Sequence, residues 1–358
     1  MSTLDEHRRQ IDAIDDKIVA LLAERLSHVL EIGRLKDSAG GVVYDPAREH
    51  LIYDRLTRRL SPPLTGEDVV AVFREIISLC RNKEKPIRVA YLGPEGSFSQ
   101  IAGISRFGHA AHYVACPSFP KVFDAVQNGG ADYGLVAIEN STQGTVPATV
   151  DAFLDSNLQI CAEVYVNAVH NLVGAGPLSE VTTVFSHPQA IAQCRRWLEA
   201  NLPGVELWEV GSTSIGALKA RETPRAAAIA SKLAAEKYGL SILAESIQDS
   251  ANNITRFLVV GHHDCAPSGQ DKTSMIVLVR NRPGALFDAL RHFKNEDINL
   301  CKIESRPTRK AAWEYMFFID CDGHREDEKL KRVLASLEQD CLYLKLLGSY
   351  PSEAQRTI

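Results

Sequence analysis

Long apolar runs are absent from this sequence of 358 residues. A helix that crosses a bilayer needs about 20 consecutive, mostly apolar residues, so we expect no membrane span and no membrane partner. An excess of positive charge is absent as well, because 40 Lys and Arg residues face 45 Asp and Glu residues and the formal net charge is −5. We therefore expect no general attraction to nucleic acid, and any anion site must be built locally.

Closely spaced cysteine pairs are also missing. The eight cysteines are scattered without a C-x-x-C pair and lie mostly in apolar contexts, as small buried residues of a reducing compartment do. The first ten residues, MSTLDEHRRQ, have no apolar core of a secretory signal. We therefore expect a cytoplasmic protein.

The motifs indicate neither a metal nor a nucleotide. The cluster His262-His263-Asp264-Cys265 carries metal-binding side chains, but no second ligand pair lies nearby, so we expect an exposed linker there. The loop 93–96 lacks the glycine spacing of a dinucleotide-binding turn and the Lys-Ser/Thr of a P-loop. We expect no cofactor and no metal.

The first part of the sequence predicts three helices. Apolar residues recur every three or four positions over 4–36, and no Pro or Gly interrupts this pattern before Gly33. Such a helix is roughly 45–50 Å long at 1.5 Å per residue, which is too long for one small domain to bury alone. Further helices fit 45–60 and 65–83. One very long helix among three favours an intertwined all-α dimer.

Two cations lie on the apolar stripe of the long helix. Arg25 and Lys36 are 11 residues apart, and a cation on a core stripe needs an anion. That anion is either a ligand or, for Arg25, a core carboxylate. Arg8 lies roughly 80–100° round the helix from them. If all three cations bind one ligand, Arg8 comes from the partner chain.

Strands and helices then alternate from 87 onward, which favours a doubly wound α/β fold with a parallel sheet. The predicted strands are 87–92, 111–115, 133–138, 160–170, 181–185, 205–210 and 226–230. Several strand ends carry hydroxyl or amide side chains just before a helix. Free N–H groups and the helix dipole favour anions at such positions. Together these junctions predict a cleft that binds a small oxyanion.

A polar stretch directly before a buried strand closes this region. Residues 247–255 are mostly Gln, Asp, Ser, Asn and Thr, which favour caps and turns, and Phe257-Leu258-Val259-Val260 is typical of a buried strand. Polar groups at the mouth of a buried strand are where α/β folds usually place their chemistry. An ordinary turn that leads into a strand is the alternative.

The last part of the sequence predicts a ferredoxin-like domain after a linker at 261–272. The predicted order is β-α-β-β-α-β, and its elements are 273–280, 284–295, 299–306, 312–319, 326–338 and 342–349. Pro283-Gly284-Ala285-Leu286 forms a turn at a helix start, where backbone N–H groups can meet a carboxylate. An appended domain of this kind is more often regulatory than catalytic.

At this point the residues resemble a known family. The matching motifs are Gly93-Pro94-Glu95-Gly96-Ser97-Phe98-Ser99, Ile138-Glu139-Asn140-Ser141, Ser186-His187-Pro188-Gln189, Thr255-Arg256-Phe257, Gly284-Ala285-Leu286 and Glu304-Ser305-Arg306-Pro307. The whole chain resembles the bifunctional chorismate mutase–prephenate dehydratases of phenylalanine biosynthesis. The resemblance implies an all-α mutase domain at 1–86, a two-lobed, periplasmic-binding-protein-like dehydratase domain at 87–262, and an ACT domain at 273–350.

The resemblance implies a mutase site built from cations. Chorismate is a dicarboxylate that rearranges within one molecule, so its enzyme holds the reactive conformer and stabilises charge on the ether oxygen. By the resemblance, Arg25 and Arg48 bind the carboxylates, Arg8 reaches in from the partner chain, and Lys36 donates to the ether oxygen. Guanidinium groups suit this task because they bind carboxylates in a bidentate manner.

Four further positions of the mutase site follow from the resemblance. Asp45 and Glu49 orient the cations and the substrate hydroxyl. Glu84 stands where some relatives have Gln, and an ionised Glu repels a developing oxyanion, so we expect Glu84 to act protonated and the mutase to be faster in acid. Cys80 stands where relatives have Ser or Thr, which puts that polar contact in doubt.

The resemblance makes Thr255 the catalytic donor of the dehydratase. This reaction removes a ring hydroxyl and CO2 from prephenate, and Arg256 and Phe257 are expected to shape the pocket. The other implied site residues are Glu139, Asn140, Ser186 and Gln193. A Thr hydroxyl is too weakly acidic to give up its proton unaided, so Glu139 or His187 is the candidate proton source. A structural role for His187 at a helix start is the alternative.

The ACT-like domain implies phenylalanine as end-product inhibitor, bound between paired domains. The implied effector residues are Gly284, Ala285, Leu286, Asn299, Leu300, Glu304, Ser305, Arg306 and Pro307. Two other functions remain open. A non-catalytic sensor would bind phenylalanine without turnover, and a plain dehydratase would use its helical domain only to dimerise. The polar Thr255 and the cationic stripe argue against both.

Overall fold

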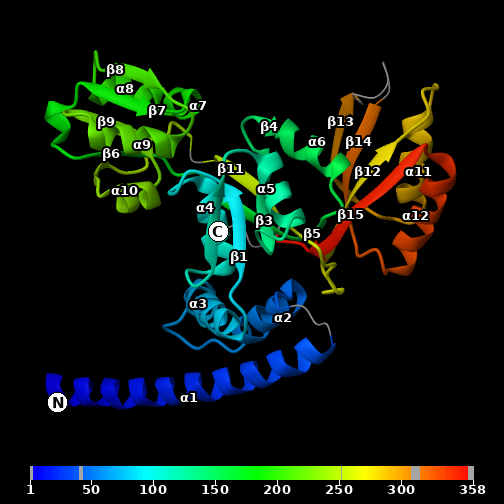
Figure 1. The fold of residues 1–358 in the computed structure, drawn as a ribbon, viewed down its shortest axis with the longest axis horizontal. Helices are drawn as coiled ribbons and strands as arrows, with labels where there is room; N and C mark the ends of the chain where they lie inside the picture. Colours follow the sequence, from blue (N-terminus) through cyan, green and yellow to red (C-terminus); the bar gives the residue numbers. More distant parts are fainter. Residues whose placement is uncertain (1–2, 40–42, 251, 308–314, 354–358) are drawn as a thin grey trace. The chain divides into compact units, whose positions relative to one another are not determined.

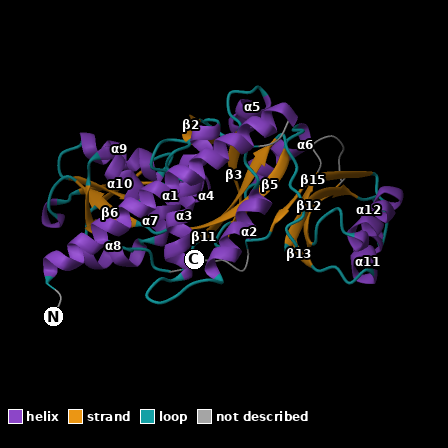
Figure 2. Cartoon of the chain, turned by 90° about the horizontal axis from the view of Figure 1, so that it is seen from below, coloured by secondary structure: helices purple, strands orange, loops and turns teal. Residues whose placement is uncertain are grey.

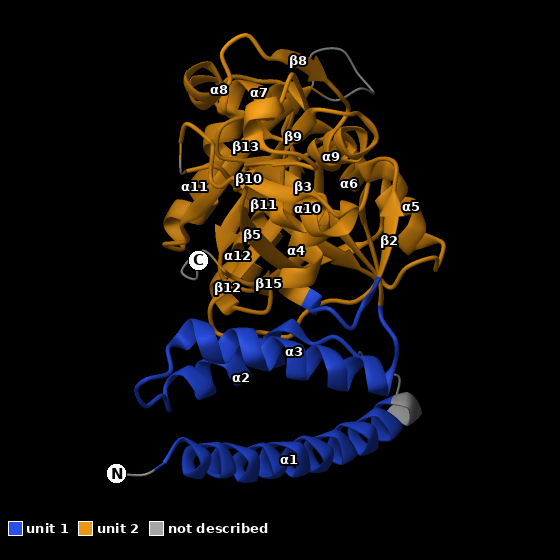
Figure 3. Ribbon diagram, turned by 90° about the vertical axis from the view of Figure 1, so that its left-hand side faces the viewer, with its two compact units in different colours: residues 1–87, 107–112 blue, residues 88–106, 113–358 orange. Residues whose placement is uncertain are grey.

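The computed structural model describes residues 3–39, 43–250, 252–307 and 315–353, and of residues 37–39 only the backbone. The chain divides into two compact units, which Figure 3 shows in different colours. The first comprises residues 1–87 and 107–112, and the second comprises residues 88–106 and 113–358. In the part of the chain that the structure describes, no helix is both long and apolar enough to cross a membrane.

The first unit is helical, as predicted. It contains α1 (Leu4–Ala39), α2 (Pro46–Thr57) and α3 (Gly66–Glu84). Asp45 caps α2 by accepting a hydrogen bond from the Arg48 amide, and Pro46 occupies the first turn, where no N–H partner is needed. Thr65 and Asp68 form a capping box at the start of α3. The predicted helices are confirmed, with bounds that differ by only a few residues.

Much of the apolar stripe on α1 is uncovered within the described part of the chain. Ile11, Ile14, Ile18 and Leu21 are 48 to 63% exposed. Burying a side chain of this kind is worth about 1.5–3 kcal/mol relative to leaving it in water. An exposed stripe of this length is therefore typical of a surface that another chain covers.

The second unit begins with a two-lobed α/β region (Figure 1). The sheet of the first lobe has the order β2-β1-β3-β11-β5, with β4 paired to β3. Its strands are β1 (Arg88–Leu92), β2 (His112–Cys116), β3 (Tyr133–Asn140), β4 (Gly144–Thr145), β5 (Gln159–Asn167) and β11 (Ile254–Gly261). Its helices are α4 (Phe98–Phe107), α5 (Phe119–Gln127) and α6 (Pro147–Asp155). The predicted buried strand after the polar stretch is thus a central strand of this sheet.

The second lobe is an insertion between β5 and β11. Its sheet has the order β10-β6-β9-β7-β8. The strands are β6 (Asn171–Gly174), β7 (Thr183–Ser186), β8 (Glu206–Glu209), β9 (Ala226–Ala230) and β10 (Ser241–Ala244). The helices are α7 (Pro188–Gln193), α8 (Arg195–Asn201), α9 (Thr213–Glu222) and α10 (Lys232–Tyr238), with a 3-10 turn at Leu178–Glu180. The chain crosses between the lobes twice, after β5 and after β10, which confirms the two-lobed prediction.

The prediction of a parallel sheet was wrong for both lobes. β1 pairs with β3 in parallel, and β7 pairs with β8 and β9 in parallel. However, β11 is antiparallel to both β3 and β5, and β6 is antiparallel to β9 and β10. The strand direction depends on where the chain returns from the other lobe, and the local alternation of strands and helices carries no information on that return.

The C-terminal part of the second unit is the predicted βαββαβ domain. Its elements are β12 (Asp271–Leu278), α11 (Ala285–Asn295), β13 (Leu300–Pro307), β14 (Tyr315–Asp322), α12 (Glu328–Asp340) and β15 (Tyr343–Pro351). The antiparallel sheet has the order β13-β14-β12-β15, and α11 and α12 cover one face (Figure 2). Residues 312–314 of the predicted strand 312–319 lie outside the described residues. The domain boundaries predicted from the sequence stay a prediction.

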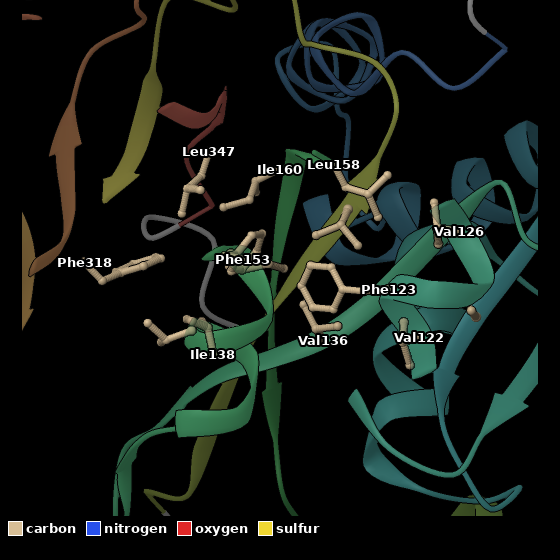
Figure 4. Close-up of a cluster of buried hydrophobic side chains, with 14 of the residues drawn as sticks. Val122, Phe123, Val126, Val136, Ile138, Phe153, Leu158, Ile160, Phe318 and Leu347 are labelled. Atoms are coloured by element: carbon tan, nitrogen blue, oxygen red, sulfur yellow. The ribbon is translucent and has the colours of Figure 1, made fainter. Parts of the chain in front are cut away.

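The other face of this sheet packs on the first lobe. Phe318 and Leu347 share one buried cluster with Phe123 and Phe153, as Figure 4 shows. At Gly348, whose φ is +148°, β15 comes so close to Ile160 on β5 that a side chain would not fit. The core is thus continuous between the first lobe and the C-terminal sheet.

Candidate active sites

The helical unit contains a pocket between its three helices that is lined by apolar and charged side chains. Five cations and three carboxylates line it, namely Arg25, Lys36, Arg48, Arg55, Arg81, Asp45, Glu49 and Glu84. Six of these were predicted from the sequence, and the fold brings all six together. A pocket with several clustered guanidinium groups suits a small molecule that carries more than one carboxylate.

Arg25 has an unpartnered guanidinium nitrogen in this pocket. Its Nη1 is buried and makes no hydrogen bond to any described residue. No carboxylate of a described residue forms an ion pair with it, so the core-carboxylate alternative finds no support there. A buried donor without an acceptor costs about 1–3 kcal/mol, and an anionic ligand would remove that cost.

Lys36 and Glu84 face each other across α1 and α3. The Lys36 Nζ lies 3.8 Å from Glu84 Oε1, and the Glu84 side chain is only 10% exposed. Gly33 makes room for Glu84, because a Cβ at position 33 would lie 2.8 Å from Glu84 Cγ. Glu84 Oε1 is buried without a hydrogen-bond partner among the described residues. One cation and one carboxyl oxygen are therefore available to a ligand side by side.

Arg81 is a pocket residue that the sequence analysis missed. Its Nη1 donates to Glu49 Oε1 at 2.6 Å, and both side chains are less than 10% exposed. Its Nη2 donates to the Phe107 carbonyl at 3.0 Å, and the guanidinium lies over the Tyr44 ring. Arg81 therefore holds Glu49 in place. The sequence feature that could have revealed Arg81 is a cation on the buried face of α3, the same kind of feature that identified Arg25 on α1.

Arg8 is not part of this pocket in its own chain. It lies 17 residues before Arg25 on α1, which corresponds to about 25 Å at 1.5 Å per residue. Its side chain is 67% exposed and its nearest described anion is Asp5, at 3.7 Å. Its expected role in the pocket thus requires a second chain.

The two-lobed region contains a cleft whose floor is the start of β11. Its lining comes from both lobes and from the segments between them, and includes Thr255, Asn140, Gln193 and His187. Among the described lining residues there is neither a Lys or Arg nor an Asp or Glu. The cleft is thus a site of hydroxyl, amide and imidazole groups, unlike the ionic pocket of the helical unit.

Thr255 and Asn140 are paired across β11 and β3. The Asn140 Nδ2 donates to Thr255 Oγ1 at 2.9 Å. The Asn140 Oδ1 accepts from the amides of Thr142 and Gln143 and from the Thr142 hydroxyl, which fixes the orientation of the amide. Because Thr255 Oγ1 already accepts a hydrogen bond, its own proton is free to be donated into the cleft.

Asn253 and His170 extend this hydrogen-bond network and were missed from the sequence. Asn253 Oδ1 accepts from Asn140, and its Nδ2 donates to Gln193 Oε1 at 3.0 Å. His170 Nε2 donates to the same oxygen at 2.9 Å, and burial lowers the pKa of His170 although this bond acts to raise it. Gln193, which was predicted, is therefore held at its oxygen by two neighbours, and its Nε2 donates to Thr142 Oγ1 at 3.2 Å. Asn253 lies in the polar stretch that drew attention to this strand.

Two predicted residues of β3 and β11 lie on the wrong face for the cleft. Successive side chains of a strand point to opposite faces, so Glu139 and Arg256 point away from the side that carries Asn140 and Thr255. Glu139 forms an ion pair with Lys302 at 2.9 Å, and Arg256 is buried beside Glu163 and Asp320. Neither residue lines the cleft. The prediction that Arg256 lines the pocket is therefore corrected, and Glu139 is not positioned as the proton source.

Ser186 and Phe257 also lie outside the cleft lining. Ser186 is fully buried at the end of β7 and donates to the Ile229 carbonyl at 2.8 Å. Phe257 is 2% exposed and lies on the Thr255 face of β11, one step deeper in the core. His187 does line the cleft, and its Nδ1 accepts from the Gln189 amide at the start of α7. His187 thus caps α7, which fits its structural alternative, and because it also lines the cleft its role as proton source stays a prediction.

The expected effector residues lie at two places in the C-terminal domain. Gly284 precedes α11 with φ +79°, followed by Ala285 and Leu286. The remaining expected residues, Asn299, Leu300, Glu304, Ser305, Arg306 and Pro307, lie on or next to β13, the edge strand of the sheet. Arg306 pairs with Asp151 of α6 at 3.3 Å, so it contacts the first lobe.

Comparison with known proteins gives matches along the chain. Three family models match in order: chorismate mutase type II over residues 7–85, prephenate dehydratase over 89–265 and the ACT domain over 273–339. The bifunctional chorismate mutase/prephenate dehydratase of Aquifex aeolicus is 44% identical over 356 residues, which cover 98% of each chain. The protein of the same name from Neisseria gonorrhoeae is also 44% identical, with 98% of each chain covered.

A solved structure is similar to most of the chain. Prephenate dehydratase from Arthrobacter aurescens, determined in complex with L-Phe, is 34% identical and has a TM-score of 0.70. The match covers 76% of this chain and 91% of that one.

Proposed function

The chain belongs to the family of bifunctional chorismate mutase/prephenate dehydratases, and from this premise we propose an assignment of one reaction to each pocket. The helical pocket converts chorismate to prephenate, and the two-lobed cleft converts prephenate to phenylpyruvate. One observation carries the proposal: a single chain combines a cation-lined pocket with a cleft whose floor presents the Thr255 hydroxyl. The first suits an intramolecular rearrangement of a dicarboxylate, and the second suits removal of a hydroxyl group.

In the helical pocket, Arg25 and Arg48 bind the two carboxylates of chorismate, and Lys36 donates to the ether oxygen. The unpartnered Nη1 of Arg25 supports this role, because an anion is the partner it lacks. Asp45 holds the start of α2, where Arg48 lies, and Glu49 is oriented by Arg81. The pocket needs no nucleophile, since holding the compact conformer and stabilising charge on the ether oxygen lower the barrier.

Arg8 acts in the pocket of a second chain within a homodimer formed through α1. The exposed apolar stripe supports this assembly, because Ile11, Ile14 and Ile18 would be covered by the partner helix. The distance of about 25 Å along α1 between Arg8 and Arg25 supports it as well. Assembly beyond a dimer and a cytoplasmic location stay predictions.

Glu84→Gln should make the mutase rate less dependent on pH. Glutamine donates a hydrogen bond at any pH, whereas an ionised carboxylate repels charge that develops on the ether oxygen beside Lys36. We expect the variant to be about tenfold or more faster than the parent at the alkaline end of the profile. Mutase kcat measured from pH 5 to 9 checks this. A profile that the substitution leaves unchanged would contradict the role of Glu84.

In the cleft, Thr255 donates to the hydroxyl that leaves prephenate. The hydrogen bond from Asn140 supports this role. Asn140 Nδ2 donates to Thr255 Oγ1, so the hydroxyl proton of Thr255 is not used in that bond and can be donated to the substrate. The absence of Lys and Arg from the described lining also fits the reaction, because a strong cation at the departing carboxylate would oppose loss of CO2. Backbone N–H groups at the starts of α4 and α9 can hold the other carboxylate.

Phenylalanine is the proposed effector of the C-terminal domain. The L-Phe complex of the Arthrobacter aurescens relative supports this, as does the turn at Gly284, which starts α11 without a side-chain cap. Inhibition requires phenylalanine to bind one arrangement of the domains better than another.

A spectroscopic assay with chorismate and then with prephenate, each with and without phenylalanine, tests the proposed function. We expect both substrates to be consumed and dehydration to slow when phenylalanine is added. Phenylalanine binding without any turnover would instead identify a sensor. Turnover of prephenate alone would show that the helical unit only dimerises.

A further inference from the structure

Two successive residue pairs between β3 and β11 contact different parts of the protein. Thr255 is the partner of Asn140 in the strand register, and these two side chains meet in the cleft. The next pair is Arg256 with Glu139. Because side chains alternate along a strand, this second pair points to the opposite face of the sheet. That is the face on which the C-terminal domain packs.

Both members of the second pair bind the C-terminal domain. The Arg256 Nη1 donates to Asp320 Oδ2 at 2.5 Å, and its Nη2 donates to the Tyr350 hydroxyl at 3.0 Å. The Glu139 Oε1 lies 2.9 Å from Lys302 Nζ. Arg256 on β11 and Glu139 on β3 thus each have a partner of opposite charge in the C-terminal domain.

The two partners are themselves paired. Lys302 on β13 and Asp320 on β14 are opposite each other in the strand register. Three cross-strand pairs therefore stand in series: Thr255 with Asn140, Arg256 with Glu139, and Asp320 with Lys302. We call this series the pair ladder. It begins in the cleft and ends on β13, which also carries Glu304 and Arg306 of the expected effector site.

The middle of the pair ladder is held rigidly. Arg256 and Asp320 are 5% and 0% exposed, and fully buried Glu163 accepts from Arg256 Nε at 2.8 Å and from Lys272 at 2.9 Å. Burial acts to raise the pKa of Glu163, but Arg256 and Lys272 hold it below its ordinary value. The cations Arg256 and Lys272 are thus buried together with the carboxylates Glu163 and Asp320, and the formal charges of the four groups cancel. A planar guanidinium with three fixed acceptors leaves β11 little freedom to shift without moving β14.

We propose that the pair ladder sets the position of the Thr255 hydroxyl and transmits the state of the C-terminal domain to it. Arg256, Glu139 and Lys302 are positioning residues, because they act through their strand neighbours and do not touch substrate. A shift of β13 moves Lys302 and Glu139, and Asn140 and Thr255 follow as the next register pair. A displacement of about 1 Å at a reacting group can cost roughly a hundredfold in rate. This inference rests on the proposed function, in that it assigns Thr255 to dehydration and phenylalanine to the C-terminal domain.

Lys302→Met tests the transmission. Glu139 is 38% exposed and stays partly hydrated, so loss of its partner is tolerated by the fold. Inhibition of the wild-type dehydratase by saturating phenylalanine is expected to be about 5- to 150-fold. In Lys302→Met we expect inhibition of at most about twofold, while calorimetry shows a phenylalanine Kd within about threefold of the wild type. Lys302→Arg keeps the charge and should restore inhibition.

Lys345→Met is the matched control. Lys345 also extends from the C-terminal domain into the first lobe, where its Nζ donates to the carbonyls of Phe153, Leu154 and Ser156. It touches neither β3 nor β11 among these bonds. We expect this variant to keep wild-type inhibition. If Lys302→Met and Lys345→Met both lose inhibition, or both keep it, the pair ladder is not the route by which the C-terminal domain acts on Thr255.

Arg256→Lys tests the positioning of Thr255 without any use of phenylalanine. Lysine keeps the charge but cannot bind Glu163, Asp320 and Tyr350 at once. We expect dehydratase kcat to fall about tenfold with KM within about twofold, and mutase kcat to stay unchanged. A dehydratase kcat within twofold of the wild type would overturn the proposal. Should phenylalanine have no effect on the wild type, the proposed effector fails, and this variant still decides whether the ladder positions Thr255.

Discussion

Thr255→Ala is expected to abolish prephenate dehydration and to leave chorismate mutase activity intact. A positioned acid or donor contributes about 10²–10⁴-fold to a rate, and we expect dehydratase kcat to fall about 10³-fold, or about 4 kcal/mol of barrier. The fold should tolerate the change. The Asn140 Nδ2 has two N–H groups. One keeps Asn253 Oδ1 at 2.9 Å, and the one that loses Thr255 lies in the lining of the cleft, where water can accept its hydrogen bond.

Thr255→Ser is the matched control for this experiment, because it keeps the hydroxyl and removes only a methyl group. We expect it to retain dehydratase kcat within about tenfold of the wild type. Steady-state kinetics with prephenate, together with phenylalanine binding by calorimetry, separates loss of chemistry from loss of structure. Comparable activity of the alanine and serine variants would contradict a donor role for Thr255.

Arg25→Met is expected to have the converse effect, a loss of mutase activity with dehydratase activity intact. Removing one donor that stabilises a bound anion costs about 10²–10³-fold, and we expect a loss of this size in mutase kcat/KM. Because Arg25 Nη1 has no partner among the described residues, its removal leaves no carboxylate unpaired. Methionine fills much of the same space, so the free energy of unfolding should change by less than about 1.5 kcal/mol.

Arg34→Met is the control on the same helix. Arg34 is 79% exposed and pairs only with the neighbouring Glu31, at 3.0 Å, which is worth little in water. Mutase kinetics with chorismate should be unchanged in this variant. A loss of mutase activity in Arg34→Met equal to that in Arg25→Met would show that α1 tolerates no such change, and would remove the evidence for a specific role of Arg25.

Residue spacing was enough to predict the helices of the first unit and the C-terminal βαββαβ order. Helix caps such as Asp45 and Thr65 and the spacing of Ile11, Ile14 and Ile18 are local signals, and local signals decide helix position. The cation argument drew attention to Arg25 and Lys36, which line one pocket in the structure, where Lys36 lies 3.8 Å from Glu84; their binding of a substrate stays a prediction. The same argument applied to α3 would have found Arg81.

Local spacing could not predict the direction of β11, nor on which side of the sheet the side chains of β11 and β3 lie. The motif Thr255-Arg256-Phe257 suggested three pocket residues, but alternation along a strand sends Arg256 to the opposite face. Which face meets the cleft depends on the return of the chain from the second lobe, and on the domain that covers the other side. Glu139 was misplaced for the same reason, since its partner Lys302 lies 163 residues further along the sequence.

His170 shows a different limit. Nothing in its sequence surroundings distinguishes it from a structural histidine, and only the fold brings its Nε2 to the Gln193 amide oxygen. Contacts over such separations are set by tertiary packing, and a single sequence does not encode them in any spacing.

The most direct test of two separate sites in one chain uses chorismate as the sole substrate at neutral pH, with prephenate and phenylpyruvate measured over time. Wild-type protein should form phenylpyruvate with transient prephenate. Thr255→Ala should convert chorismate almost completely to prephenate and stop there. Phenylpyruvate formation by Thr255→Ala at the wild-type rate, or no consumption of chorismate by the wild type, would contradict the account.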